Sequence, residues 1–147
     1  MSQNDSQLYQ TAMRVIEGYN KWNIEDIMAP RAPDCWQQVY PARMDRPKMD
    51  NETYRTFFSA MIPRFQDFTM EVLDVFEDQK RHKVALHARS TAKTDVGPYA
   101  NEYSLMLTMT EDDKQVLDIK EFLDSGYTED FFQRLRAHVA ASTGATS

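Results

Sequence analysis

Three titratable side chains occupy positions from which they could move protons or stabilise a negative charge. His87 and Arg89 alternate with small or apolar residues within 83–94, so they share one face of a predicted strand. Asp124 lies near the end of the last predicted strand, directly after Leu123. An unperturbed histidine has a pKa of about 6.5 and exchanges protons near neutrality, and apolar neighbours raise the pKa of a carboxyl group toward working pH. These residue types suit general acid–base catalysis, in which Arg89 would stabilise an enolate or phenolate.

Each of these assignments has an alternative that needs no chemistry. Asp124 precedes Ser125 and Gly126, and an aspartate at such a position often caps a turn. The face that carries His87 and Arg89 equally fits contact with solvent or a second subunit, which is the commoner arrangement for a lone histidine and arginine on a strand. Periodicity alone does not choose between these roles.

Polar residues also interrupt the apolar faces of the neighbouring predicted strands. Glu121 lies on the face opposite Asp124, where a carboxylate is costly unless it is paired, and the period does not decide whether it contacts a cavity. Asn101 and Tyr103 share a face with Leu105, which predicts that the pair points inward. Both could donate a hydrogen bond to a substrate carbonyl, although a hydrogen-bonded core tyrosine is the commoner case.

The predicted helices and the first loop supply candidates for the lining of a substrate site. Arg31 and Arg46 lie in predicted loops, where a guanidinium could meet a phenolate or carboxylate or could simply be solvated. For the apolar and aromatic candidates, ordinary core packing is the alternative. These candidates are Trp22, Ile27, Met28, Tyr54 and Phe58.

The elements that must position these groups follow from the periodicity of apolar residues. Asn23, Asn51 and Thr128 are predicted helix caps. The predicted order is helix (6–19), helix (24–29), strand (34–40), helix (52–62), four antiparallel strands (68–77, 83–94, 99–109 and 115–127) and a final helix. This order predicts an α+β fold, a cone-shaped half-barrel in which a curved antiparallel sheet wraps around three N-terminal helices, with a C-terminal helix added. A hollow that could bind a ligand is expected where sheet and helices diverge.

Composition narrows the class of protein. The length of 147 residues suits one domain, 1–147, of which we expect about 7–140 to be ordered. A formal charge of −6 disfavours nucleic acid as a partner. No stretch approaches the roughly 20 apolar residues of a membrane span, and we expect a cytoplasmic protein with no membrane partner. The lone Cys35 and the absence of metal-ligand spacings or a phosphate-binding loop predict neither metal nor cofactor.

Longer stretches of the sequence resemble one protein family. The segments "RSTAKTDVGPYANEY" (89–103) and "EFLDSGYTEDFF" (121–132) closely resemble the small SnoaL-like proteins of fungal secondary metabolism, which have the nuclear transport factor 2-like fold. The segments "YNKWNIEDIMAPRAPDC" (19–35) and "RMDRPKMDNETYRTFF" (43–58) look like the same group. The resemblance spans roughly residues 8–135, nearly the whole chain.

The resemblance implies an isomerase or cyclase that acts on an oxygenated polycyclic polyketide, xanthone-type or meroterpenoid intermediate without metal or organic cofactor. In the wider superfamily a carboxylate at the end of the last strand commonly points into the cone, which makes Asp124 the first candidate for the base, with His87 relaying the proton. Two alternatives stay open: a dehydratase on a similar substrate, and a non-catalytic dimeric binding module, in which His87, Arg89 and Asp124 would face solvent or a partner. The resemblance also implies a homodimer formed through the outer face of the strands around Met106.

Overall fold

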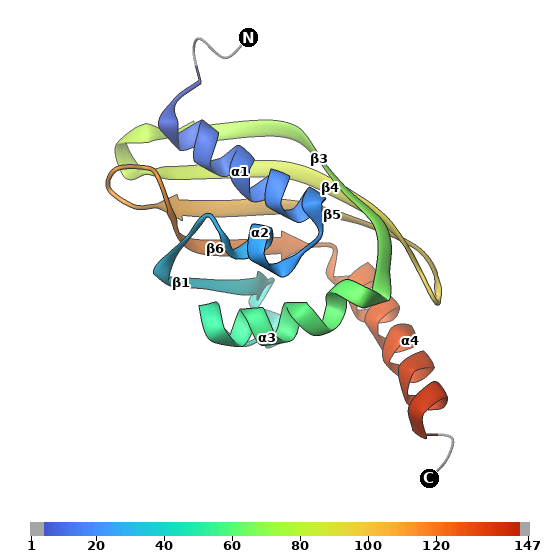
Figure 1. Cartoon of the computed structure of the whole chain (residues 1–147). Coiled ribbons are helices and arrows are strands. Elements are labelled where there is room, and N and C mark those ends of the chain that lie inside the picture. The colour runs from blue at the N-terminus through green and yellow to red at the C-terminus, as the bar shows by residue number, and fades with distance from the viewer. Residues whose placement is uncertain (1–4, 145–147) are drawn as a thin grey trace.

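The computed structural model describes residues 5–144, whose helices and strands follow the predicted order except for a two-residue strand, β2, in the segment predicted as a loop (Figure 1). The helices are α1 (Gln7–Lys21), α2 (Ile24–Met28), α3 (Asn51–Met61) and α4 (Ser125–Gly144). The strands are β1 (Arg31–Tyr40), β2 (Met49–Asp50), β3 (Phe65–Asp78), β4 (Lys83–Thr94), β5 (Gly97–Met109) and β6 (Val116–Leu123). The α+β class predicted from the sequence is confirmed.

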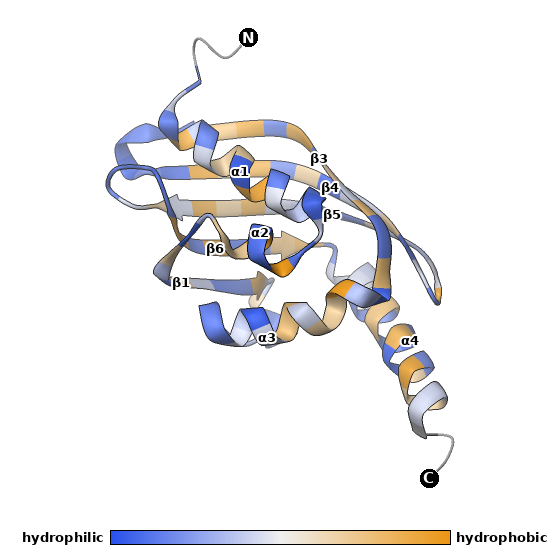
Figure 2. Cartoon of the chain, in the orientation of Figure 1, coloured by the Kyte–Doolittle hydropathy of each residue, from blue (hydrophilic) through white to orange (hydrophobic). Residues whose placement is uncertain are grey.

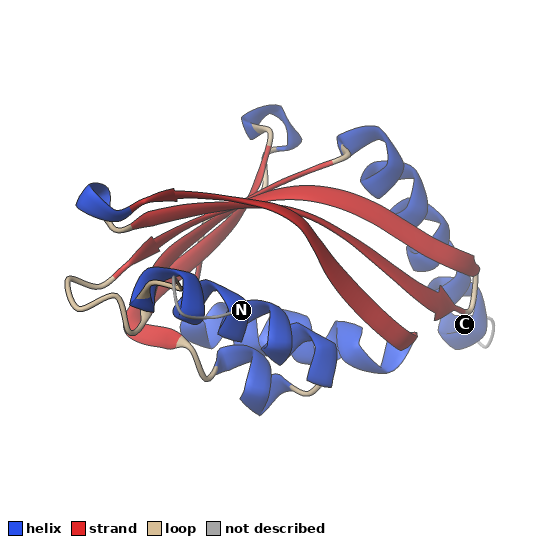
Figure 3. Ribbon diagram, turned by 90° about the horizontal axis from the view of Figure 1, so that it is seen from above, coloured by secondary structure: helices blue, strands red, loops and turns tan. Residues whose placement is uncertain are grey.

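The strands form one curved, open sheet in the order β2-β1-β6-β5-β4-β3, with α1, α2 and α3 along one of its faces (Figures 1 and 3). From β3 to β6 each strand is antiparallel to the next, as predicted. β1 instead runs parallel to β6, with Gln37 beside Ile119 and Val39 beside Glu121. No pairing was predicted for β1 from the sequence, and the predicted antiparallel arrangement does not extend to it, because side-chain alternation reports the faces of a strand but not its direction.

Local hydrogen bonds explain where the first two helices begin. At the start of α1, Ser6 Oγ accepts from the N–H of Tyr9 over 2.9 Å, and at the start of α2 Asn23 accepts from the N–H of Asp26 over 2.9 Å, as predicted. A Cβ atom at Gly18 would lie 2.5 Å from the carbonyl oxygen of Asp26. Glycine at this position therefore allows α1 and α2 to pack closely.

The start of α3 differs from the prediction by one residue. The cap is Asp50, whose Oδ1 accepts from the N–H of Thr53 over 2.9 Å, and not Asn51. Asn51 instead donates to the carbonyl oxygen of Ala32 over 2.8 Å. It is free to do so because Asp50 already satisfies the helix terminus, and the bond ties α3 to β1.

Burial alternates along the two central strands and separates an inner from an outer face. In β4 the inner face carries Leu86 and Ser90, which are buried, and the outer face carries His87. In β5 Asn101 and Tyr103 are buried, so their predicted inward orientation is confirmed. Hydrophobic residues recur along the strands and on α1 and α4, where they form the core between helices and sheet (Figure 2).

Candidate active site

Polar side chains cross the inner face of the sheet in a core that is otherwise largely apolar. Gln37 on β1, Glu121 on β6, Tyr103 on β5 and Ser90 on β4 come from four neighbouring strands. Glu121 pairs with Leu105, two residues along β5 from Tyr103, so the carboxylate and the phenol occupy diagonal positions on adjacent strands. We call these four residues the polar row.

Glu121 is the member of the polar row that titrates near neutral pH. Nε2 of Gln37 donates to Oε1 of Glu121 over 2.9 Å. Burial raises the pKa of Glu121 to about 7, although the bond from Gln37 and the charges of Arg31 and Arg46 act in the opposite direction. Near neutral pH both protonation states of this carboxyl group are therefore populated, as a general acid or base requires.

Arg31 places a cation beside this carboxyl group. The side chain is buried, one terminal nitrogen donates to the Gln37 amide oxygen, and the guanidinium lies 4.1 Å from the centre of the Tyr54 ring. Its Nε and Nη1 are also buried and have no hydrogen-bond partner among residues 5–144. Unsatisfied buried donors on a charged group are costly. Arg31 therefore offers two unused donors to an oxygen atom that enters this region.

Two tyrosine hydroxyls from the helices meet beside Arg31. Oη of Tyr19 on α1 and Oη of Tyr54 on α3 are 2.6 Å apart. Burial raises the pKa of both phenols, so both remain protonated and keep a hydrogen to donate. Tyr54 also stacks on Phe58, with ring centres 5.3 Å apart. Together with Arg31 they occupy the region between sheet and helices in which a hollow was expected.

A second network of buried hydroxyls continues from the polar row toward α4. Oη of Tyr103 lies 2.7 Å from Oγ of Ser90 and 3.2 Å from Oη of Tyr99. Nδ2 of Asn101 donates to Oη of Tyr99 and to Oγ1 of Thr128, each over 2.9 Å. The negative charge of Glu121 is among the causes that raise the pKa of Tyr99 and Tyr103. The polar row and this second network therefore share Ser90 and Tyr103, and the charge of Glu121 acts on both.

The structure places His87 and Arg89 away from these networks. Both lie on the exposed outer face, where Nε2 of His87 is 2.5 Å from a carboxylate oxygen of Glu102 and Nε of Arg89 donates to Glu71 over 2.9 Å. This orientation agrees with the alternative given for these residues above, in which their face of the strand contacts solvent or a second subunit. A catalytic role for either residue remains a prediction.

Asp124 is exposed and stands at the start of α4. Its Oδ1 accepts from the N–H of Tyr127 over 3.0 Å, so it caps the helix. The helix consequently begins at Ser125, and the prediction that Thr128 is the cap is wrong. The structure does not bring Asp124 to Glu121 or to His87, and its role as a base also remains a prediction.

The remaining predicted lining residues mostly belong to the core. Nε1 of Trp22 donates to the carbonyl oxygen of Ile62 over 2.9 Å and its ring stacks on Phe68. Met28 is buried in the same apolar cluster. Arg46 is partly buried, and its charge reaches Glu121.

Sequence reasoning missed several members of the two networks: Tyr19, Gln37, Ser90, Tyr99 and Thr128. One signal was present, since Tyr99 precedes Asn101 and Tyr103 at steps of two and so shares their inward face. The partnership of Gln37 with Glu121 had no local signal, because it joins residues 84 positions apart.

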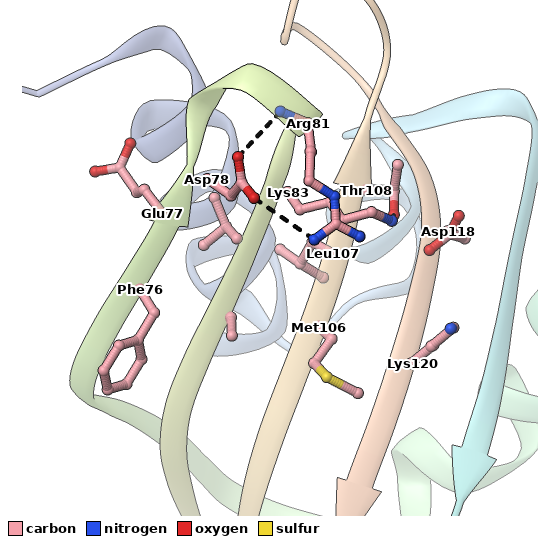
Figure 4. A pocket seen from close by; sticks show the side chains of 12 residues that line it. Phe76, Glu77, Asp78, Arg81, Lys83, Met106, Leu107, Thr108, Asp118 and Lys120 are labelled. Atoms are coloured by element: carbon pink, nitrogen blue, oxygen red, sulfur yellow. Dashed lines mark hydrogen bonds and ion pairs between the residues drawn. The ribbon is translucent and has the colours of Figure 1, made fainter.

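A shallow hollow of about 400 Å³ lies on the other side of the sheet. Figure 4 shows Phe76, Met106 and Lys120 among the side chains around it, together with the ion pair of Arg81 and Asp78. None of the residues in the polar row lines this hollow. The cluster of acid, guanidinium and phenol groups is therefore separate from it.

The described residues offer few other reactive groups. Burial raises the pKa of the Cys35 thiol to about 11, so the thiol is protonated at neutral pH and is a poor nucleophile. Within residues 5–144, no three His, Cys, Asp or Glu side chains are placed to hold a metal ion together. In the same range no helix combines the length and apolar character of a membrane span.

Comparison with known proteins finds relatives along almost the whole chain. No model of a protein family matches the sequence. "Austinoid biosynthesis clusters protein F" from Penicillium brasilianum is 30% identical over 142 residues, which cover 94% of this chain and 93% of the relative. The crystal structure of BvnE pinacolase from Penicillium brevicompactum superposes with a TM-score of 0.87 at 27% identity, covering 93% of this chain and 97% of that one. The chain belongs to the fungal SnoaL-like family of secondary-metabolism proteins.

Members of the SnoaL-like family carry the names of different activities. "Monooxygenase nsrQ" from Aspergillus novofumigatus is 26% identical over 130 residues, 88% of this chain and 86% of the relative. A protein from Shewanella denitrificans described as "Putative SnoaL-like polyketide cyclase", at a TM-score of 0.70 and 10% identity over 86% of this chain and 97% of that one, shares the fold alone. Membership of the family therefore leaves the reaction to be argued from the polar row and Arg31.

Proposed function

We propose that the protein is an isomerase or cyclase that acts by acid–base chemistry, without a cofactor, on an oxygenated polycyclic polyketide, xanthone-type or meroterpenoid intermediate. The names of its relatives support a role in secondary metabolism. The observation that carries the reaction type is the carboxyl group of Glu121, whose pKa burial raises to about 7. A group with this pKa removes a proton and returns it at the same pH.

In the proposed reaction the Glu121 carboxylate takes a proton from a carbon next to a ketone of the substrate. The electron pair of the broken C–H bond moves onto the ketone oxygen and forms an enolate, and Glu121 becomes a carboxylic acid. In an isomerisation the acid returns the proton to a different carbon of the conjugated enolate. In a cyclisation the enolate carbon attacks a second carbonyl, and the resulting alkoxide takes the proton. Atoms balance in both cases, so the mass of the substrate is unchanged.

Arg31 and Tyr103 would stabilise the negative charge that develops on the substrate oxygen. Arg31 contributes Nε and Nη1, the buried donors without a partner, and a preorganised donor in a buried site typically contributes about 10²- to 10³-fold to turnover. Tyr103 lies on the strand next to Glu121 and keeps its hydrogen, since burial raises its pKa well above 10.0. In this proposal Glu121, Arg31 and Tyr103 form one site on the inner face of the sheet.

Two other reactions remain alternatives, and product mass separates all three. A dehydratase would use protonated Glu121 to release a substrate hydroxyl as water, and the names of some relatives suggest oxygen insertion. The test is to incubate the purified protein with polycyclic intermediates from its own biosynthetic cluster and to follow mass and isomer identity. The proposal predicts a product of unchanged mass. A product lighter by one water or heavier by one oxygen would overturn it.

We also propose that two copies associate through the outer face of the sheet. Phe76 and Phe122 are 61% and 38% exposed, and Met106 lines the same hollow as Phe76 in Figure 4, with Ala85 of β4 between them. Exposed apolar side chains of this kind commonly mark an interface. Light scattering should give the mass of two chains for the native protein and of one chain for Phe76→Glu. A monomeric native protein at micromolar concentration would contradict the proposal.

A further inference from the structure

The amide of Asn101 has only one possible orientation. Its Oδ1 lies 2.9 Å from the backbone nitrogen of Glu102, which can only donate. The NH₂ end must therefore face the other two partners, so one hydrogen goes to Oη of Tyr99 and the other to Oγ1 of Thr128, each over 2.9 Å. Asn101 is 6% exposed, and both of its hydrogens are used inside the protein. Asn101 therefore has no hydrogen left to donate to a substrate, which was its predicted role.

This orientation sets the direction of the next hydrogen bond. Oη of Tyr99 accepts from Asn101, and its only other hydrogen-bond partner among residues 5–144 is Oη of Tyr103 at 3.2 Å. If Tyr103 donated to Tyr99, the Tyr99 hydrogen would be left without an acceptor in a buried place, which is costly. Tyr99 therefore donates to Tyr103. Burial raises the pKa of Tyr99 to about 12, so the hydrogen is present at any working pH.

Tyr103 accepts from Tyr99 and consequently keeps its own hydrogen for another acceptor. In the protein without substrate that acceptor is Oγ of Ser90, 2.7 Å away. Ser90 is itself a hydroxyl and can reverse its role to donate to Tyr103. The hydrogen of Tyr103 is then free to turn toward an oxygen beside Glu121.

We propose that Asn101 is a positioning residue, which fixes the direction of the chain Asn101 to Tyr99 to Tyr103 so that Tyr103 presents a hydrogen to the substrate oxygen. Asn101 does not touch the substrate in this arrangement and acts through Tyr99. The inference rests on the proposed function, in which Tyr103 stabilises an oxyanion beside Glu121. Thr128 takes the second amide hydrogen and so anchors the chain to α4.

The substitution that tests the direction is Asn101→Asp. When it is ionised, a carboxylate has the same shape as the amide but no hydrogen, so Tyr99 turns its hydrogen to residue 101 and Tyr103 can no longer accept it. Turnover is therefore compared at the highest pH at which the variant is folded. We expect kcat to fall at least about tenfold while KM changes less than about twofold. In a Tyr103→Phe background the same substitution should not lower kcat further, because the Tyr103 hydroxyl hydrogen that it redirects is absent. An equal loss in both backgrounds would overturn the proposal and assign Asn101 a structural role.

Asn20→Asp provides a matched control. The Asn20 amide donates to the carbonyl oxygen of Met70 over 3.0 Å and accepts from its N–H over 2.7 Å, so it also makes bonds at both ends. Its side chain has no hydrogen bond to the polar row or to the tyrosine hydroxyls among residues 5–144, and we expect this variant to melt at a lower temperature but to keep kcat below its melting point. A tenfold loss of kcat in Asn20→Asp as well would overturn the specific role of Asn101.

A second measurement needs no substrate. NMR of the native protein with labelled tyrosine locates the hydroxyl hydrogen of Tyr99 from its nuclear Overhauser contacts, with Tyr99→Phe used for assignment. The proposal predicts contacts to the ring of Tyr103. Contacts to residues 101 and 128 in their place would overturn it. If the contacts are as predicted but Glu121→Gln keeps full activity, the direction of the chain stands and the proposed function falls.

Discussion

Gln37 joins the buried guanidinium of Arg31 to the partly buried carboxyl group of Glu121. Its amide nitrogen donates to Oε1 of Glu121 over 2.9 Å, and its amide oxygen accepts from Arg31. The two partners come from the start of β1 and from β6, which run parallel. One side chain therefore holds the acid and the guanidinium in fixed relation, and its loss should affect both.

Gln37→Met tests this connection at nearly constant side-chain volume. The bond from Gln37 lowers the pKa of Glu121, so removing it should raise that pKa further above 7. If Glu121 acts as a base, the ionisation in the pH profile of kcat/KM should move to higher pH. An unchanged profile, or a shift to lower pH, would show that Glu121 is not the group that titrates.

The raised pKa of Glu121 also predicts how stability depends on pH. The folded state holds the proton up to about pH 7, against an ordinary value of 4.5. The stability contributed by the protonated carboxyl group is therefore fully present below about pH 4.5 and is lost as the pH rises to about 7. At roughly 1.4 kcal/mol for each unit of pKa difference, the loss is on the order of a few kcal/mol.

Glu121→Gln should remove this dependence, because an amide does not titrate. Urea unfolding is expected to show that the variant is more stable than the native protein at pH 8, and that the difference largely disappears near pH 5. The same gain at both pH values would contradict a titrating Glu121. A lower stability of the variant at pH 8 would show that the ionised carboxylate is well satisfied in the fold.

Arg31→Met should lower turnover without lowering the melting temperature. A buried guanidinium with two unpaired donors is costly, so near pH 5, where Glu121 is protonated and loses no counter-charge, an apolar side chain of similar length should leave the melting temperature unchanged or raise it. Turnover should fall about 10²- to 10³-fold. The control is Arg55→Met, which removes only the exposed ion pair with Glu25 and should change neither quantity much. Full turnover in Arg31→Met would exclude Arg31 from the site.

Two substitutions at Asp124 distinguish a capping role of this residue from a catalytic one. Asparagine caps helices about as well as aspartate, so Asp124→Asn should keep both stability and turnover, whereas Asp124→Ala should lose about 1 kcal/mol of stability. Turnover and denaturant unfolding of the two variants check this. A loss of about 10²-fold or more in turnover for Asp124→Asn would return Asp124 to the role of base.

The sequence predicted the elements better than the side-chain partnerships. Alternation placed Asn101 and Tyr103 inward, because apolar neighbours mark their face. It left the orientation of His87 undecided, since the inner face of β4 also carries the small residues Ala88, Ser90 and Ala92. Arg31 was a candidate from its charge alone and Gln37 was not predicted at all, because the parallel pairing of β1 with β6 that brings both to Glu121 leaves no periodic trace.

The most direct test of the central claim is the turnover of Glu121→Gln beside that of Glu25→Gln. The second variant makes the same type of substitution at Glu25, which forms an exposed ion pair with Arg55 and lies outside the polar row. With a substrate from the same biosynthetic cluster and folding verified by circular dichroism, we predict a loss of about 10²- to 10⁴-fold for Glu121→Gln and none for Glu25→Gln. Full turnover in a folded Glu121→Gln variant would contradict the account.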